Sequence, residues 1–221
     1  MTFYELLDLF TFVSPIVLFV GVVTGAYCYR SLDLSHKVIM YYLLIALSTD
    51  VISRIYGHVY GNNLIFILIF ALLELAVFSI LYYNLLKKNK KVFLIGIGIA
   101  VLFMLWEIWS LKMLHVADFQ SYSKVVDTFL IVCFSIAYFF EKINSQTQTE
   151  WDLFLLNSVI LGFFSLNLIF FLPINYLINE TSILKFYFWF ANLILTLLFY
   201  VFLTRAIWKN GRTHKQLRRG L

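Results

Sequence analysis

Seven apolar stretches, each about as long as a membrane span, take up most of this chain. They cover residues 10–30, 38–56, 64–86, 92–109, 124–140, 153–175 and 183–207. A helix needs ~20 mostly apolar residues to cross the hydrocarbon core of a bilayer. Hydrophobic residues make up 62% of the chain, whereas a soluble domain has ~45–50% and could not bury so much apolar surface. We therefore predict an all-α, polytopic membrane protein with a bundle of seven transmembrane helices.

The basic residues predict the orientation of this bundle. Of the 17 lysines and arginines, 13 fall near alternate breaks, from Arg30 and Lys37 through the lysines of residues 87–91 and Lys142 to the C-terminal segment. Because cytoplasmic loops retain lysine and arginine, we expect the N-terminus outside and the C-terminus inside the cytoplasmic (inner) membrane. Residues 1–208 then form the transmembrane domain. Residues 209–221 form a short basic tail that can lie along an anionic leaflet or dock a cytoplasmic partner.

A few charged side chains fall inside the apolar stretches. A charge at the centre of a membrane helix costs ~2.5–3.5 kcal/mol, so such residues usually face the bundle interior and mark function. Asp50 and Arg54 are four residues apart, which places them on one helix face as a potential ion pair. Glu74 lies near the middle of its stretch with no partner on its own helix. We therefore take Glu74 as the strongest functional candidate.

The polar residues at membrane depth gather toward the expected outer side, and the inner half of the bundle is almost purely apolar. This asymmetry predicts an outward-facing polar cavity lined by the second, third, fourth, fifth and seventh helices. The expected ligand contacts are Asp50, Arg54, Glu74, Glu107, Asp127 and Asn192. A structural interpretation stays open for several of them: Asp50 and Arg54 as an ion pair, Glu107 and Asp127 in contact with interfacial water, and the asparagines as hydrogen bonds between helices.

Several functional classes lack their signature residues in this sequence. No Gly-rich phosphate-binding loop appears, and the four histidines lie in breaks or in the tail, away from any zinc-site spacing. Retinal proteins share the seven-helix layout but hold the chromophore on a lysine in the middle of the last helix. Here the only lysine near that part of the chain is Lys185, at one end. We expect no cofactor, no metal and no nucleic-acid partner.

Loose motifs in three of the stretches resemble those of the small seven-helix membrane proteins common in Bacteroidetes. They are Tyr41 and Tyr42 with Thr49 and Asp50, then Asn62 and Asn63 with Glu74, Tyr82 and Tyr83, and finally Phe188 and Trp189 with Asn192, Trp208 and Lys209. Similar bundles are fused to sensor histidine kinases in that group. The resemblance implies a sensory role, with the signal passing to a separate partner because this chain continues only briefly after its last stretch.

These observations favour a receptor-like membrane module that binds a small molecule or lipid. Two alternatives stay open. The first is a lipid-hydrolysing or lipid-modifying enzyme that uses the carboxylates of Asp50 and Glu74, similar in size to the lysoplasmalogenase type but with one helix fewer. The second is a proton-coupled transporter that uses Glu74, although the sequence shows no internal repeat of the kind that many transporters carry.

Overall fold

The computed structural model describes residues 3–88, 90–110, 122–144, 151–177 and 184–219. These residues form seven α-helices and one short 3-10 turn, with no strand among them. The helices are α1 (Phe3–Cys28), α2 (Leu34–Tyr60), α3 (Ile65–Leu85), α4 (Lys90–Ser110), α5 (Tyr122–Ile143), α6 (Trp151–Leu177) and α7 (Leu184–Arg219), and the 3-10 turn is Tyr29–Ser31. All seven α-helices are long and apolar enough to cross a membrane. The prediction of an all-α chain with seven such helices is confirmed.

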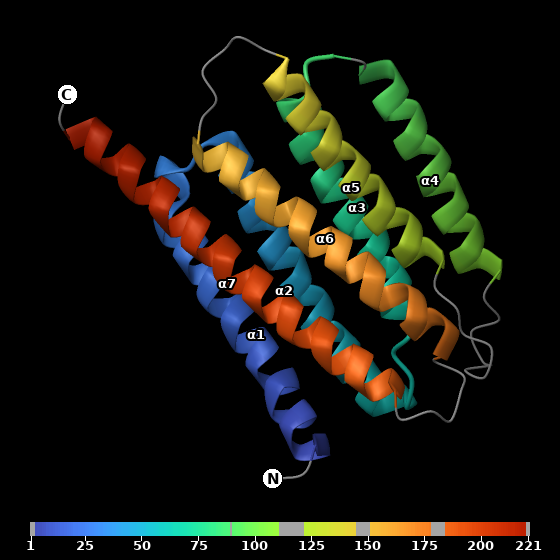
Figure 1. Ribbon diagram of the computed structural model, residues 1–221. Helices are drawn as coiled ribbons and strands as arrows, with labels where there is room; N and C mark the ends of the chain where they lie inside the picture. The colour runs from blue at the N-terminus through green and yellow to red at the C-terminus, as the bar shows by residue number, and fades with distance from the viewer. Residues whose placement is uncertain (1–2, 89, 111–121, 145–150, 178–183, 220–221) are drawn as a thin grey trace.

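Six of the helices form a closed ring, and α4 lies outside it (Figure 1). The ring runs α1, α2, α3, α5, α6 and α7, and α7 closes it against α1. Helix α4 packs on the outer side of α3 and α5 and buries only Phe93, Ala100, Met104 and Glu107. Each helix packs on the next one along the chain, and α3 and α5 also pack directly on each other.

The two ends of the ring can be told apart by the turns they carry. Helix α1 begins at the end that also holds the α2–α3 turn, which we call the N-terminal end. Helix α7 finishes at the opposite end, beside the α1–α2 turn, which we call the C-terminal end (Figure 1). At the N-terminal end, Gly61 stops α2 in a left-handed conformation with φ of 72°, which glycine adopts at no steric cost. Asn62 then accepts a 2.9 Å hydrogen bond from the backbone N–H of Leu64, just before α3 begins.

Helix α7 continues well past the predicted end of its apolar stretch at residue 207. On this extension, the side-chain amide of Asn210 donates to the Asp33 carboxylate at 2.9 Å and accepts from the Asp33 backbone N–H at 3.2 Å. A Cβ at Gly211 would lie 2.6 Å from the Cβ of Cys28, so only glycine allows α1 this close. The segment expected as a separate basic tail is therefore helical through Arg219, and its first turn is fastened to the α1–α2 turn.

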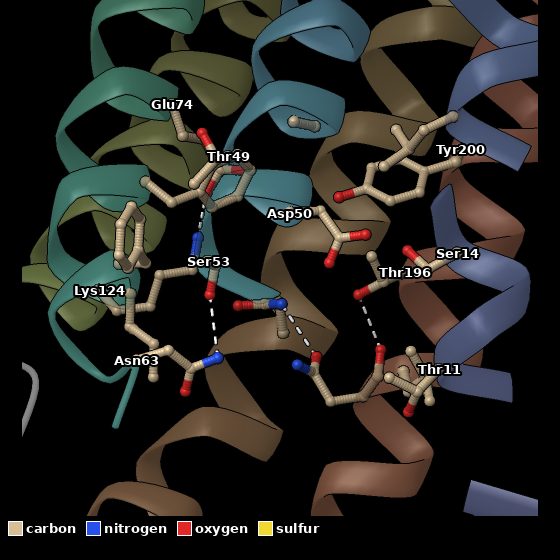
Figure 2. Close-up of a pocket in the computed structure, with 18 of the residues that line it drawn as sticks. Thr11, Ser14, Thr49, Asp50, Ser53, Asn63, Glu74, Lys124, Thr196 and Tyr200 are labelled. Atoms are coloured by element: carbon tan, nitrogen blue, oxygen red, sulfur yellow. Dashed lines mark hydrogen bonds and ion pairs between the residues drawn. The ribbon is translucent and has the colours of Figure 1, made fainter. Parts of the chain in front are cut away.

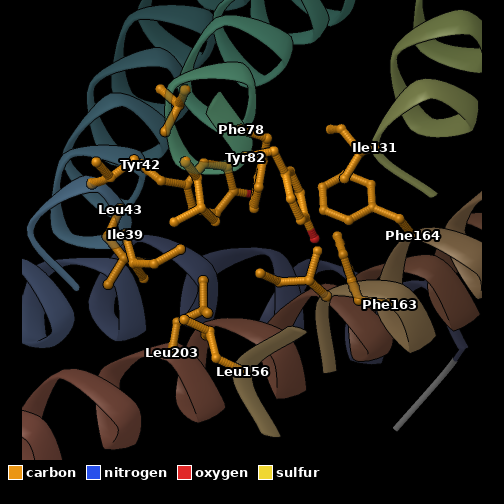
Figure 3. Packing of buried hydrophobic residues seen from close by; sticks show 14 of the residues in the cluster. Ile39, Tyr42, Leu43, Phe78, Tyr82, Ile131, Leu156, Phe163, Phe164 and Leu203 are labelled. Carbon is orange, nitrogen blue, oxygen red and sulfur yellow. The ribbon is translucent and has the colours of Figure 1, made fainter. Parts of the chain in front are cut away.

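The C-terminal half of the ring is filled by a core of aromatic and branched side chains (Figure 3). The rings of Phe163 and Phe199 stack at a centroid distance of 3.9 Å, and Phe78 meets Phe164 edge-on. One polar network is embedded in this core, where the Tyr82 hydroxyl donates to Asn157 at 2.7 Å. Large side chains in this core, including Leu43, Phe78, Ile160 and Leu203, are fully buried. The ring is therefore closed over this half of its length.

Candidate ligand-binding cavity

A cavity of about 530 Å³ lies inside the ring, in the half nearer the N-terminal end (Figure 2). Its walls come from α1, α2, α3, α5, α6 and α7. Exposure of the lining falls along the cavity: Asn63 is exposed beside the α2–α3 turn, whereas Tyr42 and Glu74 are buried. The cavity therefore opens at the N-terminal end and stops at the aromatic core. Helix α4 was predicted to line it, but α4 contributes no lining residue in the part that the structure describes, because it lies outside the ring.

The first charged pair lies on the wall formed by α2. The Nε of Arg54 donates to both carboxylate oxygens of Asp50 at 3.1 Å, so the ion pair expected from their spacing is formed. The Nη2 of Arg54 also donates to the backbone carbonyl of Thr11 on α1 at 2.8 Å, which holds the guanidinium in place. The side chains of Arg54 and Asp50 are 32% and 26% exposed. Both charges therefore remain accessible from the cavity.

The second charged group is a buried cluster of Glu74, Lys124 and Asp127. The Nζ of Lys124 donates to one oxygen of Glu74 and, at 3.1 Å, to Asp127, which lies three residues later on the same helix. The other oxygen of Glu74 accepts from the Tyr42 hydroxyl at 2.8 Å. Glu74 is 1%, Lys124 7% and Asp127 0% exposed. Glu74 and Lys124 line the floor of the cavity, while Asp127 lies behind them.

Charge balance in this cluster is incomplete. Two carboxyl groups are buried beside one ammonium group, and Oδ1 of Asp127 has no hydrogen-bond partner among the described residues. Burying an uncompensated carboxylate is costly, so such groups are stabilised by a partner or take up a proton. The ammonium of Lys124 also lies 5.5 Å from the ring centroid of Phe70 and 5.9 Å from that of Phe164. Ring faces attract cations, so both rings contribute to holding the Lys124 side chain in this position.

Amide side chains form the opposite wall of the cavity. Asn167 of α6 donates to Asn192 of α7 at 3.0 Å, so the predicted hydrogen bond between the last two helices is present. The backbone carbonyl of Asn192 accepts from Thr196 at 2.8 Å. Oδ1 of Asn167 is buried and lacks a partner in the described part of the chain. Asn167 lines the cavity, so an unused acceptor lies within this wall.

The structure separates the six residues expected to contact a ligand into two groups. Asp50, Arg54, Glu74 and Asn192 all line the cavity. Asp127 does not line the cavity, because it lies behind Lys124. Glu107 lies outside it on α4, where its carboxylate accepts from the backbone N–H groups of residues 122 and 123 at 2.8 and 2.6 Å. Glu107 therefore stabilises the start of α5 through the unpaired N–H groups of its first turn.

Lys124 is the charged lining residue that was not among the expected ligand contacts. Counting residues along α5 places it at the end of the helix, where a lysine is ordinary. Its long side chain instead reaches Glu74, 50 positions away in the chain. The signal available in the sequence was a Lys–Asp pair at i, i+3 in one apolar helix and an unpaired carboxylate in another. Opposite charges of that kind are expected to find each other inside a membrane.

The cavity offers several kinds of group that can contact a bound molecule. It presents both signs of charge, hydrogen-bonding hydroxyl and amide groups, and the rings of Phe66, Phe171 and Trp189. No histidine or cysteine is among its lining residues, and the described residues contain no group of three His, Cys, Asp or Glu placed to hold a metal ion. No protein-family model, curated protein or solved structure matches this chain.

Proposed function

We propose that this chain is a receptor-like membrane module that binds a small charged molecule, or the headgroup of a lipid, from outside the cytoplasm. The N-terminal end of the bundle then faces outward and the C-terminal end inward. The positive-inside distribution supports this orientation, because Lys37, Lys87, Lys142 and Lys209 all lie toward the C-terminal end. The cavity mouth would therefore face the outside of the inner membrane of a bacterium.

One observation carries the proposal: a cavity with charges of both signs at two depths, closed at its inner end. Its volume lies within the ~300–1,000 Å³ typical of small-molecule sites. Asp50 and Arg54 offer a carboxylate and a guanidinium partway along the wall, and Lys124 and Glu74 repeat both charges on the floor. Such an arrangement suits a zwitterionic ligand. The aromatic core beyond the floor supports binding over conduction, because a pore would need a polar path through it.

Helix α7 is the element best placed to transmit a signal. It lines the cavity with Asn192, Thr196 and Tyr200 and then continues without interruption to Arg219 at the C-terminal end. A ligand shifts a conformational equilibrium only if it binds one arrangement better than the other. A ligand that draws Asn192 and Lys124 together would displace α7 relative to α5. A separate cytoplasmic or membrane partner would then respond to the basic end of α7, as the resemblance to membrane sensors implies.

The proposal is tested by thermal unfolding of the purified protein with a panel of zwitterions, made up of free amino acids, glycine betaine, glycerophosphocholine and lysophosphatidylethanolamine. A compound that binds the folded form raises its stability by ~2.7 kcal/mol at 100 times its Kd. We expect one class to raise the unfolding midpoint of the wild type and of the control Glu141→Gln. The carboxylate of Glu141 lies at the C-terminal end of the bundle, far from the cavity, where it accepts from the backbone N–H of Lys87. The shift should be lost in Glu74→Gln. An equal shift in Glu74→Gln, or no shift with any compound, would contradict the proposal.

A second candidate function is proton-coupled transport, which the buried Glu74, Lys124 and Asp127 favour. Two carboxyl groups around one ammonium can exchange a proton when a ligand reaches Lys124. Uptake into proteoliposomes with and without a proton gradient separates the two functions, because a receptor accumulates no compound in either case. The enzymatic alternative is less favoured, since Asp50 is bound by Arg54 and Glu74 by Tyr42 and Lys124.

A further inference from the structure

A second hollow lies at the C-terminal end of the bundle, far from the cavity described above. It has a volume of about 440 Å³ and is formed by the end of α1 and the last turns of α7. Its lining residues are aromatic, basic, small or amide in character, and none is acidic: Tyr27, Cys28, Trp208, Gly211, Arg212, Lys215 and Gln216. The basic residues here were expected to lie along an anionic leaflet or to dock a partner, but neither expectation accounts for a formed hollow that places them beside aromatic rings.

Two stacked aromatic rings line this hollow, and each ring has one cation beside it. Tyr27 and Trp208 stack at a centroid distance of 6.3 Å. The guanidinium of Arg212 lies 5.8 Å from the Trp208 ring, and Nζ of Lys215 lies 5.4 Å from the Tyr27 ring. The rings are 72% exposed for Tyr27 and 43% exposed for Trp208. Both rings lie near the ends of their apolar spans, the level at which tyrosine and tryptophan settle in the headgroup region of a bilayer.

The two cations of the hollow have no anionic partner among the described residues. Neither Arg212 nor Lys215 forms an ion pair there, and the nearby acidic side chains are already engaged. Asp152 pairs with Lys209 at 2.7 Å. Asp33 loses hydration by burial, but its hydrogen bonds outweigh this cost and lower its pKa. Two exposed positive charges without an anionic partner in the described part of the chain thus line the hollow.

The hollow is held open by fixed contacts on either side. The hydrogen bonds between Asn210 and Asp33 fasten α7 to the α1–α2 turn, immediately before Arg212. The close approach of Gly211 to Cys28 sets the distance between the two helices. The turn of α7 that carries Arg212 and Lys215 is therefore positioned over Tyr27 before anything binds. Such preorganisation lowers the entropic cost of binding a ligand.

We propose that this hollow binds the phosphate-bearing headgroup of an anionic phospholipid such as phosphatidylglycerol. Arg212 and Lys215 would donate to the phosphate, since guanidinium and ammonium groups pair strongly with phosphate oxygens. Tyr27 and Trp208 would contact the glycerol and the upper acyl chains. A lipid fits the site better than a soluble phosphate, because two of the seven lining residues are aromatic side chains exposed at the ends of two membrane spans.

The test is lipid titration of the detergent-purified protein followed by native mass spectrometry. Phosphatidylglycerol should bind the wild type more tightly than phosphatidylcholine. The double substitution Arg212→Gln with Lys215→Gln should weaken phosphatidylglycerol binding roughly 30-fold, a factor of about five for each charge. Both residues are exposed, so the variant should fold. The control is Lys87→Gln with Lys88→Gln, which removes two exposed charges at the same end and should leave phosphatidylglycerol binding unchanged.

Three results would overturn this site. Equal affinity of the wild type for the two lipids would remove the role of headgroup charge. An equal loss of phosphatidylglycerol affinity in both double variants would show that the lipid responds only to the general positive charge of this end of the bundle. Displacement of phosphatidylglycerol by inorganic phosphate at matching concentration would assign the hollow to a soluble anion instead. None of these outcomes depends on whether the larger cavity binds a zwitterion.

Discussion

Replacing Lys124 by methionine should destabilise the protein more than any other single substitution at the cavity. Methionine keeps the length and most of the volume of the side chain but removes its charge. Glu74 and Asp127, which are 1% and 0% exposed, would then lie side by side with no cation between them. Removing one partner of a buried ion pair costs ~3–5 kcal/mol, because the remaining charge stays desolvated. We expect a loss of this size in the free energy of unfolding at neutral pH.

The cost should come from the unpaired carboxylates and not from the lost side chain. The triple variant Lys124→Met, Glu74→Gln and Asp127→Asn removes both charges as well, and should recover much of the stability that Lys124→Met loses. Acidic pH should also restore part of the stability that Lys124→Met loses, because protonation neutralises the two carboxyl groups. Denaturation by sodium dodecyl sulfate, followed by circular dichroism, measures each variant. A Lys124→Met protein within ~0.5 kcal/mol of wild type, the range of ordinary surface changes, would refute the reasoning.

Three further predictions concern the packing that surrounds the sites. Gly211→Ala should lower the unfolding midpoint because its Cβ would meet Cys28 at 2.6 Å, whereas Gly98→Ala, with open space around it, should not. Asn157→Ala removes buried hydrogen bonds to two helices and should cost roughly 1–3 kcal/mol in detergent unfolding. Because the folded-state pKa of Asp33 is lowered, its stabilisation is complete above about pH 4 and is lost as the pH falls further. Asp33→Asn should make unfolding midpoints less sensitive to pH in that range.

The helices could be predicted from hydropathy, but their ends could not. Each apolar stretch falls on one α-helix, because a membrane span needs an unbroken run of such residues. Hydropathy measures the part of a helix that is apolar, however, and not the length of the helix. At Trp208 the side chains become polar while the backbone continues helical to Arg219. The contacts of Asn210 and Gly211 that support this extension join residues far apart in the chain, so no local sequence pattern predicts them.

The sequence predicts that charged side chains form the site, but not which of them pair with each other. The energetic argument that an isolated Glu74 is too costly was sound and required a partner. Position along α5 did not identify Lys124 as that partner, because a side chain of this length reaches well beyond its own Cα. The neighbour relation between α3 and α5 was the missing fact. Once α4 is known to lie outside the ring, Glu74, Lys124 and Asp127 come together without further assumption.

The position of α4 also explains how a charged cavity can coexist with a closed core. In the ring, α3 and α5 pack directly, so Glu74 and Lys124 neutralise each other within the wall. An intervening α4 would separate these charges, and each would then need its own partner in an apolar environment. Glu107, the carboxylate that α4 does carry, is used at its end to hold the start of α5. Under the proposed function, the position of α4 outside the ring therefore lowers the free-energy cost of burying charged side chains at the floor of the ligand site.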